Sequence, residues 1–251
     1  MKRVAVSLFV ASLLPISALP LIGQTTATSP TDQLFIQVDK AFSGITPVSS
    51  AVLTAVVRAY AGSQQSSGQA TLTASADGSS SVVLQLGSGE RSESQDTFAN
   101  GQGCTWTGSD GQTHTPAAQN CLLPVAWFLP EVSLFSTQQP SSGTLSAEAS
   151  NGNGPVLHWA MSPAPGISAS QLNSLPSLGS YDLHVDPLTG LPSSLTYDLH
   201  PDNNAADNIP VSVAYSEYQT INGVAIPFHI QRYLNGTLSL DITLSNAVIT
   251  H

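Results

Sequence analysis

The stretch VSVAYSEYQTINGVAIPFHIQRYLNGTLSLDITLSNAVI, residues 211–249, decides the fold of this chain. Apolar and polar residues alternate over 211–219, 224–233 and 237–249, and an Asn-Gly pair lies at each junction. Alternation with a period of two is typical of half-buried strands, and Asn-Gly favours tight hairpin turns. The stretch therefore predicts consecutive antiparallel strands with one apolar and one polar face.

The pairing of these strands follows from the rule that opposed residues share a face of the sheet. The apolar residues of 211–219 are odd-numbered, whereas those of the next strand are even-numbered. The two sets lie on the same face only if Asn222-Gly223 is a two-residue turn. The second junction is predicted to be a three-residue loop, Leu234-Asn235-Gly236, with a bulge. The resulting apolar face consists of Tyr215, Ile226, Phe228, Ile230, Leu238, Leu240, Ile242 and Leu244.

This apolar face must be covered, because its burial is worth several kcal/mol at about 25 cal/mol per Å². In one interpretation it packs as a solid core beneath helix-forming segments. In the other it lines an internal cavity for an acyl chain, and the eight residues are the candidate ligand-binding site.

Upstream of this stretch, the sequence indicates one amphipathic helix followed by more strands. Ser29 and Pro30 have the features of a helix start, and apolar residues then recur at helical spacing, which predicts a helix over 31–43. A long strand is expected over 48–60, with shorter strands around Leu72 and Leu84.

The middle of the chain is less regular. The strand pattern weakens over 90–107, and prolines interrupt the apolar segment 122–135, where short helical turns over an apolar surface are expected. Segments 139–154 and 162–180 are rich in Ser, Gly and Pro and are predicted to be loops.

Tyr-Asp-Leu-His occurs at 181–184 and again at 197–200. The recurrence predicts two partner strands in which the residue numbers of each opposed pair add up to an even number. Their hairpin loop must then hold an odd number of residues, and a loop of three or five is expected around Thr189-Gly190-Leu191.

The N-terminus indicates export. Lys2 and Arg3 precede a short apolar run, so residues 1–24 are expected to be a signal peptide and 25–251 one mature domain, periplasmic or secreted. No later segment is apolar enough for a membrane span, so an integral membrane protein is not expected. The formal net charge of −10 and the scattered basic residues make a nucleic-acid partner implausible.

The two cysteines, Cys104 and Cys121, suit a disulfide in an oxidising compartment. In the chain-entropy model, closing the loop between them stabilises the fold by about 3 kcal/mol. The rival interpretation, a pair of metal ligands, lacks the close C-x-x-C spacing.

Two polar sets were candidates for chemistry. The predicted registers place Ser216 opposite His229 and His229 opposite Asp241 on the polar face, which suggests a hydrolase, but the chain lacks the G-x-S-x-G turn. The other set is Asp182, His184, Asp198 and His200 on one face of their hairpin, which could hold a divalent metal or form cross-strand ion pairs. A solvated polar face is the preferred interpretation of both, with no metal, no cofactor and no enzymatic activity expected.

The end of the chain resembles the periplasmic lipoprotein-carrier (LolA-like) superfamily. The resemblance rests on Val185-Asp186-Pro187, Thr189-Gly190-Leu191-Pro192, Tyr215-x-x-Tyr218 and Asn222-Gly223-Val224-x-Ile226-Pro227. It is similar to exported bacterial proteins of an uncharacterised branch of that superfamily.

The resemblance implies an α+β, mostly antiparallel fold: a half-open curved sheet, or incomplete barrel, with an N-terminal helix and short helices covering its concave apolar face. It also implies that the chain shelters a hydrophobic ligand as a carrier or sensor, with a lipid or lipidated protein as partner. The alternative is a structural or partner-binding envelope protein with a packed core, and a hydrolase using Ser216, His229 and Asp241 is a remote third.

Overall fold

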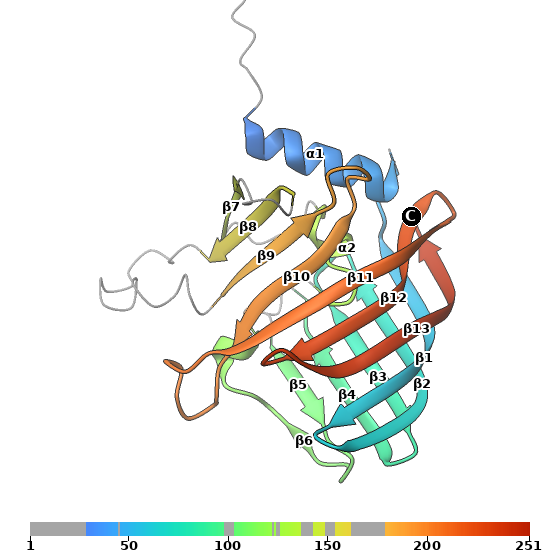
Figure 1. The fold of residues 1–251 in the computed structure, drawn as a ribbon, viewed down its shortest axis with the longest axis vertical. Helices are drawn as coiled ribbons and strands as arrows, with labels where there is room; N and C mark the ends of the chain where they lie inside the picture. Colours follow the sequence, from blue (N-terminus) through green and yellow to red (C-terminus); the bar gives the residue numbers. More distant parts are fainter. Residues whose placement is uncertain are drawn as a thin grey trace, which may run out of the picture.

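The strands of the computed structural model form one continuous antiparallel sheet (Figure 1). The structure describes residues 29–44, 46–97, 103–121, 123, 126–136, 143–148, 154–161 and 179–251. The expected signal peptide, residues 1–24, and most of the expected loop 162–180 lie outside these residues. Within the described part of the chain, no helix is long and apolar enough to span a bilayer.

The sheet has thirteen described strands in the order β6-β5-β4-β3-β2-β1-β13-β12-β11-β10-β9-β8-β7. The first half comprises β1 Ser50–Ala61, β2 Gln64–Ser75, β3 Ser80–Leu86, β4 Gly89–Gln95, β5 Cys104–Thr107 and β6 Thr113–His114. The second half comprises β7 Gly143–Glu148, β8 Val156–Met161, β9 Ser180–Val185, β10 Pro192–Leu199, β11 Ile209–Ile221, β12 Val224–Leu234 and β13 Thr237–Thr250. The pairing of β1 with β13 joins the two halves into one sheet.

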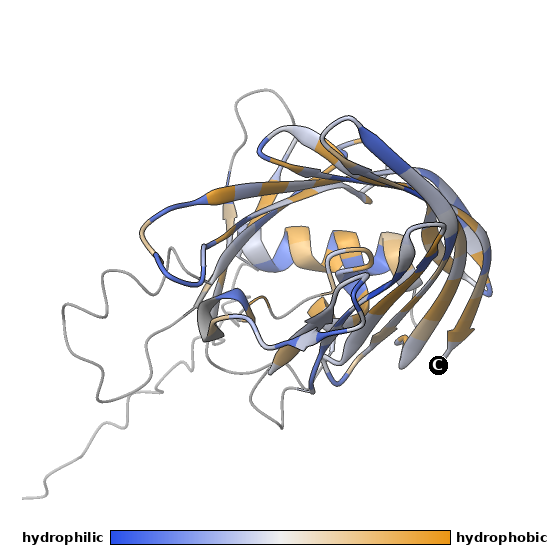
Figure 2. Ribbon diagram, turned by 90° about the horizontal axis from the view of Figure 1, so that it is seen from below, coloured by the Kyte–Doolittle hydropathy of each residue, from blue (hydrophilic) through white to orange (hydrophobic). Residues whose placement is uncertain are grey.

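The sheet is strongly curved, and its concave side carries the core. In Figure 2 the helix α1, Pro30–Ser43, lies across the hollow of the sheet. Leu34, Val38 and Phe42 of α1 belong to the same buried cluster as the inward residues of β1, such as Leu53 and Val57. The expected half-open curved sheet with an N-terminal helix over its apolar face is therefore confirmed.

The helix α1 begins and ends as its sequence predicts. Ser29 Oγ accepts a hydrogen bond of 3.1 Å from the backbone N–H of Asp32, and Pro30 follows the cap. Gly44 ends the helix at φ 66°, a left-handed value that glycine adopts without steric cost. Two shorter helices are present. The helix α2 (Glu131–Leu134) lies within 122–135, where short helical turns were expected, and the 3₁₀-helix η2 (Ala118–Cys121) lies directly before that segment.

The Asn222-Gly223 turn has the predicted form. Ile221 pairs directly with Val224, and both turn residues have positive φ, 51° and 85°. Tyr215 consequently lies opposite Ile230 on the concave face.

The second junction differs from the prediction in one detail. Leu234 pairs with Thr237, so Asn235-Gly236 is a two-residue turn, with φ of 48° and 72°. The three-residue loop was wrong because the bulge lies within β13, where the register shifts at Ser239. Its hydroxyl donates to the carbonyl of Arg232 at 2.8 Å. Beyond the bulge, the residue numbers of opposed pairs in β12 and β13 add up to an even number, as predicted. Ile230 therefore opposes Ile242, and both are fully buried.

The hairpin of β9 and β10 keeps the predicted facial pairing, with Tyr181 opposite Tyr197 and Leu183 opposite Leu195. Its loop spans residues 186–191, longer than expected, and the register shifts near Ser193. The loop is held by Asp186, whose Oδ1 accepts from the backbone N–H groups of Leu188 (2.7 Å) and Thr189 (3.0 Å).

One predicted loop contains a strand. The segment 139–154 includes β7, whose residues alternate too weakly to be recognised, and β7 forms the sheet edge next to β8. Gly143 lies so close to Trp159 of β8 that a Cβ there would be 2.2 Å from the indole ring. A glycine that suggests a loop in the sequence is therefore required by close approach to an aromatic ring.

Candidate functional site

On the core side, a cavity of about 460 Å³ is not filled by protein and is here called the main cavity. It lies between β3 to β5, β10 and the cover segment, which we define as the described residues of 117–135. The inner wall is apolar and aromatic, with Val82, Trp127, Phe128 and Tyr197. The remaining wall carries more exposed polar residues, among them Ser80, Ser94, Thr105, Asn120, Asp198 and Asp202. A volume of this size suits a small ligand.

A charged pair lies at the base of the main cavity. Arg232 of β12 is even-numbered and therefore projects to the apolar face with Ile230. Its Nη1 donates to Glu93 Oε1 at 2.9 Å and to Oε2 at 3.2 Å. Trp127 completes the arrangement, because its Nε1 donates to Glu93 Oε2 at 3.2 Å and its ring centroid lies 4.8 Å from the guanidinium carbon.

This pair connects parts of the chain that are far apart in sequence: β12, β4 and the cover segment. Arg232 is 8% exposed. Burial acts to lower the pKa of its guanidinium, but attraction to Glu93 outweighs burial, and the pKa is raised from its ordinary value. The arginine therefore stays charged, and Glu93 neutralises it.

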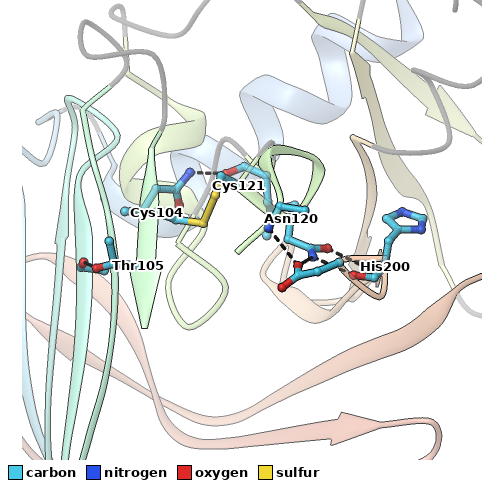
Figure 3. The surroundings of a disulfide bond; sticks show 10 residues. Cys104, Thr105, Asn120, Cys121 and His200 are labelled. Carbon is cyan, nitrogen blue, oxygen red and sulfur yellow. Dashed lines mark hydrogen bonds between the residues drawn. A yellow bond between two sulfur atoms is a disulfide. The ribbon is translucent and has the colours of Figure 1, made fainter. Parts of the chain in front are cut away.

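The disulfide stands in the wall of the main cavity (Figure 3). Cys104 of β5 is bonded to Cys121 of η2, with a Cα–Cα distance of 5.4 Å. The predicted disulfide is confirmed. It fastens the start of the cover segment to one side of the curved sheet.

Asn120 fastens the same turn to the other side, as Figure 3 shows. Its Nδ2 donates to the carbonyl of His200 at 2.7 Å, and its Oδ1 accepts from the N–H of His200 at 2.8 Å. Asp202 accepts a further hydrogen bond of 2.8 Å from the N–H of Ala117. Residues 117–121, here called the clasp, thus join β5 to the loop between β10 and β11.

Two polar atoms at this cavity are buried without a hydrogen-bond partner: Nε2 of His200 and Nε of Arg232. The other ring nitrogen of His200, Nδ1, lies 3.1 Å from the carbonyl oxygen of Asp207. Buried polar atoms without partners cost free energy, and a bound ligand is one way to satisfy them.

A second cavity of about 430 Å³ adjoins the first. Val82, Glu93, Trp106 and Arg232 line both, so the charged pair stands between them. The wall of the second cavity also includes Leu84, Leu234 and Leu240.

The eight residues of the predicted apolar site mostly lie in the packed core beside these cavities. Tyr215, Ile226, Ile230, Leu240, Ile242 and Leu244 are buried, Phe228 packs against them, and Leu238 is half-buried. Of the eight, Leu240 lines one of the two cavities described here. The apolar face thus supports the cavities more than it lines them.

Glu131, at the start of α2, is a buried carboxyl group beneath β11. It is 1% exposed, and neither carboxyl oxygen has a hydrogen-bond partner. Burial raises the pKa of Glu131 to about 8. Glu131 also affects Tyr215 and Tyr218, because burial followed by repulsion from Glu131 raises the pKa values of both.

Tyr218 reaches the inside through a local irregularity of β11. Glu217 has a positive φ of 57°, which reverses the facial alternation at this point. As a result Tyr218 turns inward and its hydroxyl donates to the carbonyl of Pro192 at 2.8 Å, while Tyr215 donates to the carbonyl of Trp127 at 2.6 Å. Strict alternation of 211–219 would have left Tyr218 on the polar face.

The Ser216, His229 and Asp241 side chains do meet on the convex face, but in a different register from the one predicted. Ser216 pairs with His229 as expected, whereas His229 pairs with Thr243, so Asp241 reaches the ring diagonally. Ser216 Oγ lies 3.4 Å from His229 Nδ1, and His229 Nε2 lies 2.7 Å from Asp241 Oδ1. Ser216 is exposed and lies outside both cavities, whereas His229 and Asp241 are half-buried.

The two Asp-x-His pairs do not assemble into one site. Asp182 lies 2.6 Å from His158 of β8, Asp198 accepts from Asn208, and His200 joins the clasp. Within the described residues, no three His, Cys, Asp or Glu side chains come together as a possible metal site.

The sequence contained a signal for part of the main cavity. The parity that places Ile230 on the apolar face also places Arg232 there, and Glu93 shares a face with its partner Val82. An arginine and a glutamate on facing apolar surfaces indicate a buried pair. The position of His200 depends on the clasp, which no local pattern predicts.

No protein-family model and no curated protein matches this chain. Solved structures do. A DUF1329 family protein from Desulfovibrio piger superposes with a TM-score of 0.51, at 10% identity, over 88% of this chain and 94% of that chain. A LolA superfamily protein from Nitrosomonas europaea superposes with a TM-score of 0.49, at 10% identity, over 89% of this chain and 95% of that chain. At such identity the likeness is one of fold alone.

Proposed function

We propose that this protein shelters a hydrophobic ligand, a lipid or an acyl chain, in the main cavity, as a carrier or sensor and not as an enzyme. The observation that carries the proposal is the cavity itself: about 460 Å³ with an aromatic inner wall, next to a second cavity of about 430 Å³ on the concave side of the sheet. Export to the periplasm or beyond belongs to the same proposal and rests on residues 1–24.

The wall and the cover give this proposal its physical basis. Val82, Trp127 and Phe128 present apolar surface that a chain can cover, and each methylene group buried there is worth about 0.8 kcal/mol. The disulfide and the charged pair hold the cover segment in place around the cavity, so the space does not depend on one flexible loop. A preformed site of this kind binds with little loss of conformational freedom.

The alternative is a structural or partner-binding envelope protein with a packed core. It is favoured by the dense packing of most of the predicted apolar face, in which Ile226, Ile230 and Ile242 are fully buried. The two functions differ in whether the main cavity is occupied in the cell.

Native mass spectrometry of the protein purified from a bacterial envelope tests the proposal directly. We expect a bound species of lipid mass that is lost on delipidation. In titrations of the delipidated protein with monoacylglycerols of octanoyl to tetradecanoyl chains, affinity should rise by about fourfold per methylene until the cavity is full.

A matched pair of variants places the binding in the main cavity. Ser80 of β3 lines the cavity, and Ser80→Phe should fill it and weaken binding of the monoacylglycerol at least about tenfold. Val83→Phe on the other face of β3 is the control and should leave binding unchanged. Protein without bound lipid and without affinity for any of these chains would refute the proposed function.

A further inference from the structure

The charges around the main cavity disfavour an acidic ligand. Among the described residues that line it, Arg232 is the sole basic side chain apart from His200, and Glu93 already neutralises it through the two contacts from Nη1. Asp198 and Asp202 stand nearby on the more exposed part of the wall, and in the described part of the chain their partners are neutral groups, among them those of Asn208 and Ala117. An anionic head group would therefore meet a net negative wall, in a chain of formal charge −10.

The free hydrogen-bonding atoms point to the same class of ligand. The carbonyl of Asp207 can only accept, so His200 Nδ1 is the donor in their 3.1 Å contact. In the neutral ring, Nε2 then holds a lone pair, and it is buried without a partner in a residue that is 3% exposed. The carboxylates of Asp198 and Asp202 are acceptors too. Hydrogen-bond donors of a ligand would complement these acceptors.

One free donor complements these acceptors. Arg232 Nε is buried without a partner, in a residue that is 8% exposed. Because Glu93 balances the charge of the guanidinium, Nε needs only a neutral acceptor, such as the carbonyl oxygen of an ester.

Resting on the proposed function, we propose that the ligand of the main cavity has an uncharged, hydroxyl-bearing head group joined to its acyl chain through an ester. The hydroxyl groups donate to the acceptors of His200 and the aspartates, and the ester carbonyl accepts from Arg232. Acylglycerols have this chemistry, and free fatty acids do not.

The test compares 1-monolaurin with laurate, which carry the same acyl chain, below their critical micelle concentrations and at about pH 8, where a carboxylic acid head group is ionised. We expect the delipidated protein to bind monolaurin at least about tenfold more tightly. Raising the salt concentration should strengthen laurate binding and leave monolaurin binding nearly constant.

The double variant Asp198→Asn/Asp202→Asn isolates the electrostatic part. Both asparagines keep an acceptor oxygen, and we expect the preference for monolaurin over laurate to fall by about three- to tenfold. Glu148→Gln/Glu217→Gln removes the same charge from exposed residues that do not line either cavity and should leave the preference unchanged.

Equal binding of laurate and monolaurin by the unchanged protein overturns this inference and leaves the proposed function standing. An unchanged preference in the Asp198→Asn/Asp202→Asn variant overturns it as well. If neither compound binds, the proposed function fails together with it.

Discussion

At the scale of single residues, Glu131 is the clearest case of a side chain whose burial costs stability. A carboxyl group whose pKa is raised by burial favours the protonated form in the folded protein. Between the ordinary pKa of glutamate and about 8, the folded state therefore holds a proton that the unfolded state has released. Folding stability must fall as the pH rises through this window and level off above about pH 8.

Replacing Glu131 with glutamine removes this ionisation while keeping the shape of the side chain. We expect Glu131→Gln to be more stable than the unchanged protein by up to about 4 kcal/mol at pH 8 and to differ little near pH 4. Urea unfolding across this pH range measures the difference. Glu148→Gln, at an exposed glutamate of β7, is the control, and an identical pH profile for Glu131→Gln and the unchanged protein would contradict the assignment.

The hydrolase hypothesis depends on Ser216. Its hydroxyl lies 3.4 Å from His229 Nδ1, on the exposed convex face and away from both cavities. Water reaches this hydroxyl freely, whereas nucleophilic catalysis gains from a site that excludes water. We expect Ser216→Ala and the unchanged protein to hydrolyse p-nitrophenyl esters at the same low rate; loss of turnover in the variant would revive the hydrolase hypothesis.

At the scale of secondary-structure elements, turn chemistry was reliable and loop length was not. Asn222-Gly223 formed the predicted turn because both residues adopt positive φ readily. Asn235-Gly236 formed the same kind of turn, and the extra residue that parity demanded appeared at Ser239 within β13. The odd or even sum of paired residue numbers shows that one extra residue must be accommodated. It does not show whether the loop or the strand contains that residue.

Releasing the clasp should affect both the stability of the fold and ligand binding. In the chain-entropy model, the Cys104–Cys121 bond stabilises the fold by about 3 kcal/mol, and it also holds the clasp against β5. We expect Cys104→Ser/Cys121→Ser to lose about this much free energy of unfolding and to bind monolaurin more weakly, because the cavity wall loses one anchor.

Chemical denaturation and ligand titration measure both effects of the double serine variant. A reducing agent should shift the unfolding midpoint of the unchanged protein and leave that of the variant where it is. A variant with unaltered stability and affinity would show that the hydrogen bonds of Asn120 and Asp202 hold the clasp without the disulfide.

At the scale of the whole molecule, the sheet brings together segments that are remote in the sequence. The last long strand, β13, pairs with the first, β1, so that β12 and β4 lie on facing parts of the curved surface. This closure is what allows Arg232 to reach Glu93. A cavity then arises where the polar inner side of β4 meets the aromatic residues of the cover segment.

Much of the architecture followed from local pattern. Alternation identified the C-terminal strands and the side of each that faces the core, and helical spacing identified α1 almost to the residue. The strand β7 was missed because its evidence lies in Trp159, a residue of another strand. Of the eight residues predicted to line a ligand site, Leu240 lies at a cavity; Trp127, Glu93 and His200, which line the main cavity, were not among the eight.

By itself, the sequence determined which residues face the core, because the two-residue period of a strand depends on backbone geometry alone. Only the tertiary structure decided where that core is solid and where it is hollow. Filling depends on the side-chain volumes that opposing surfaces bring together, and here those surfaces come from β3 to β5, β10, β12 and the cover segment. No continuous segment of the sequence contains all of these side chains, so the main cavity became visible only in the folded protein.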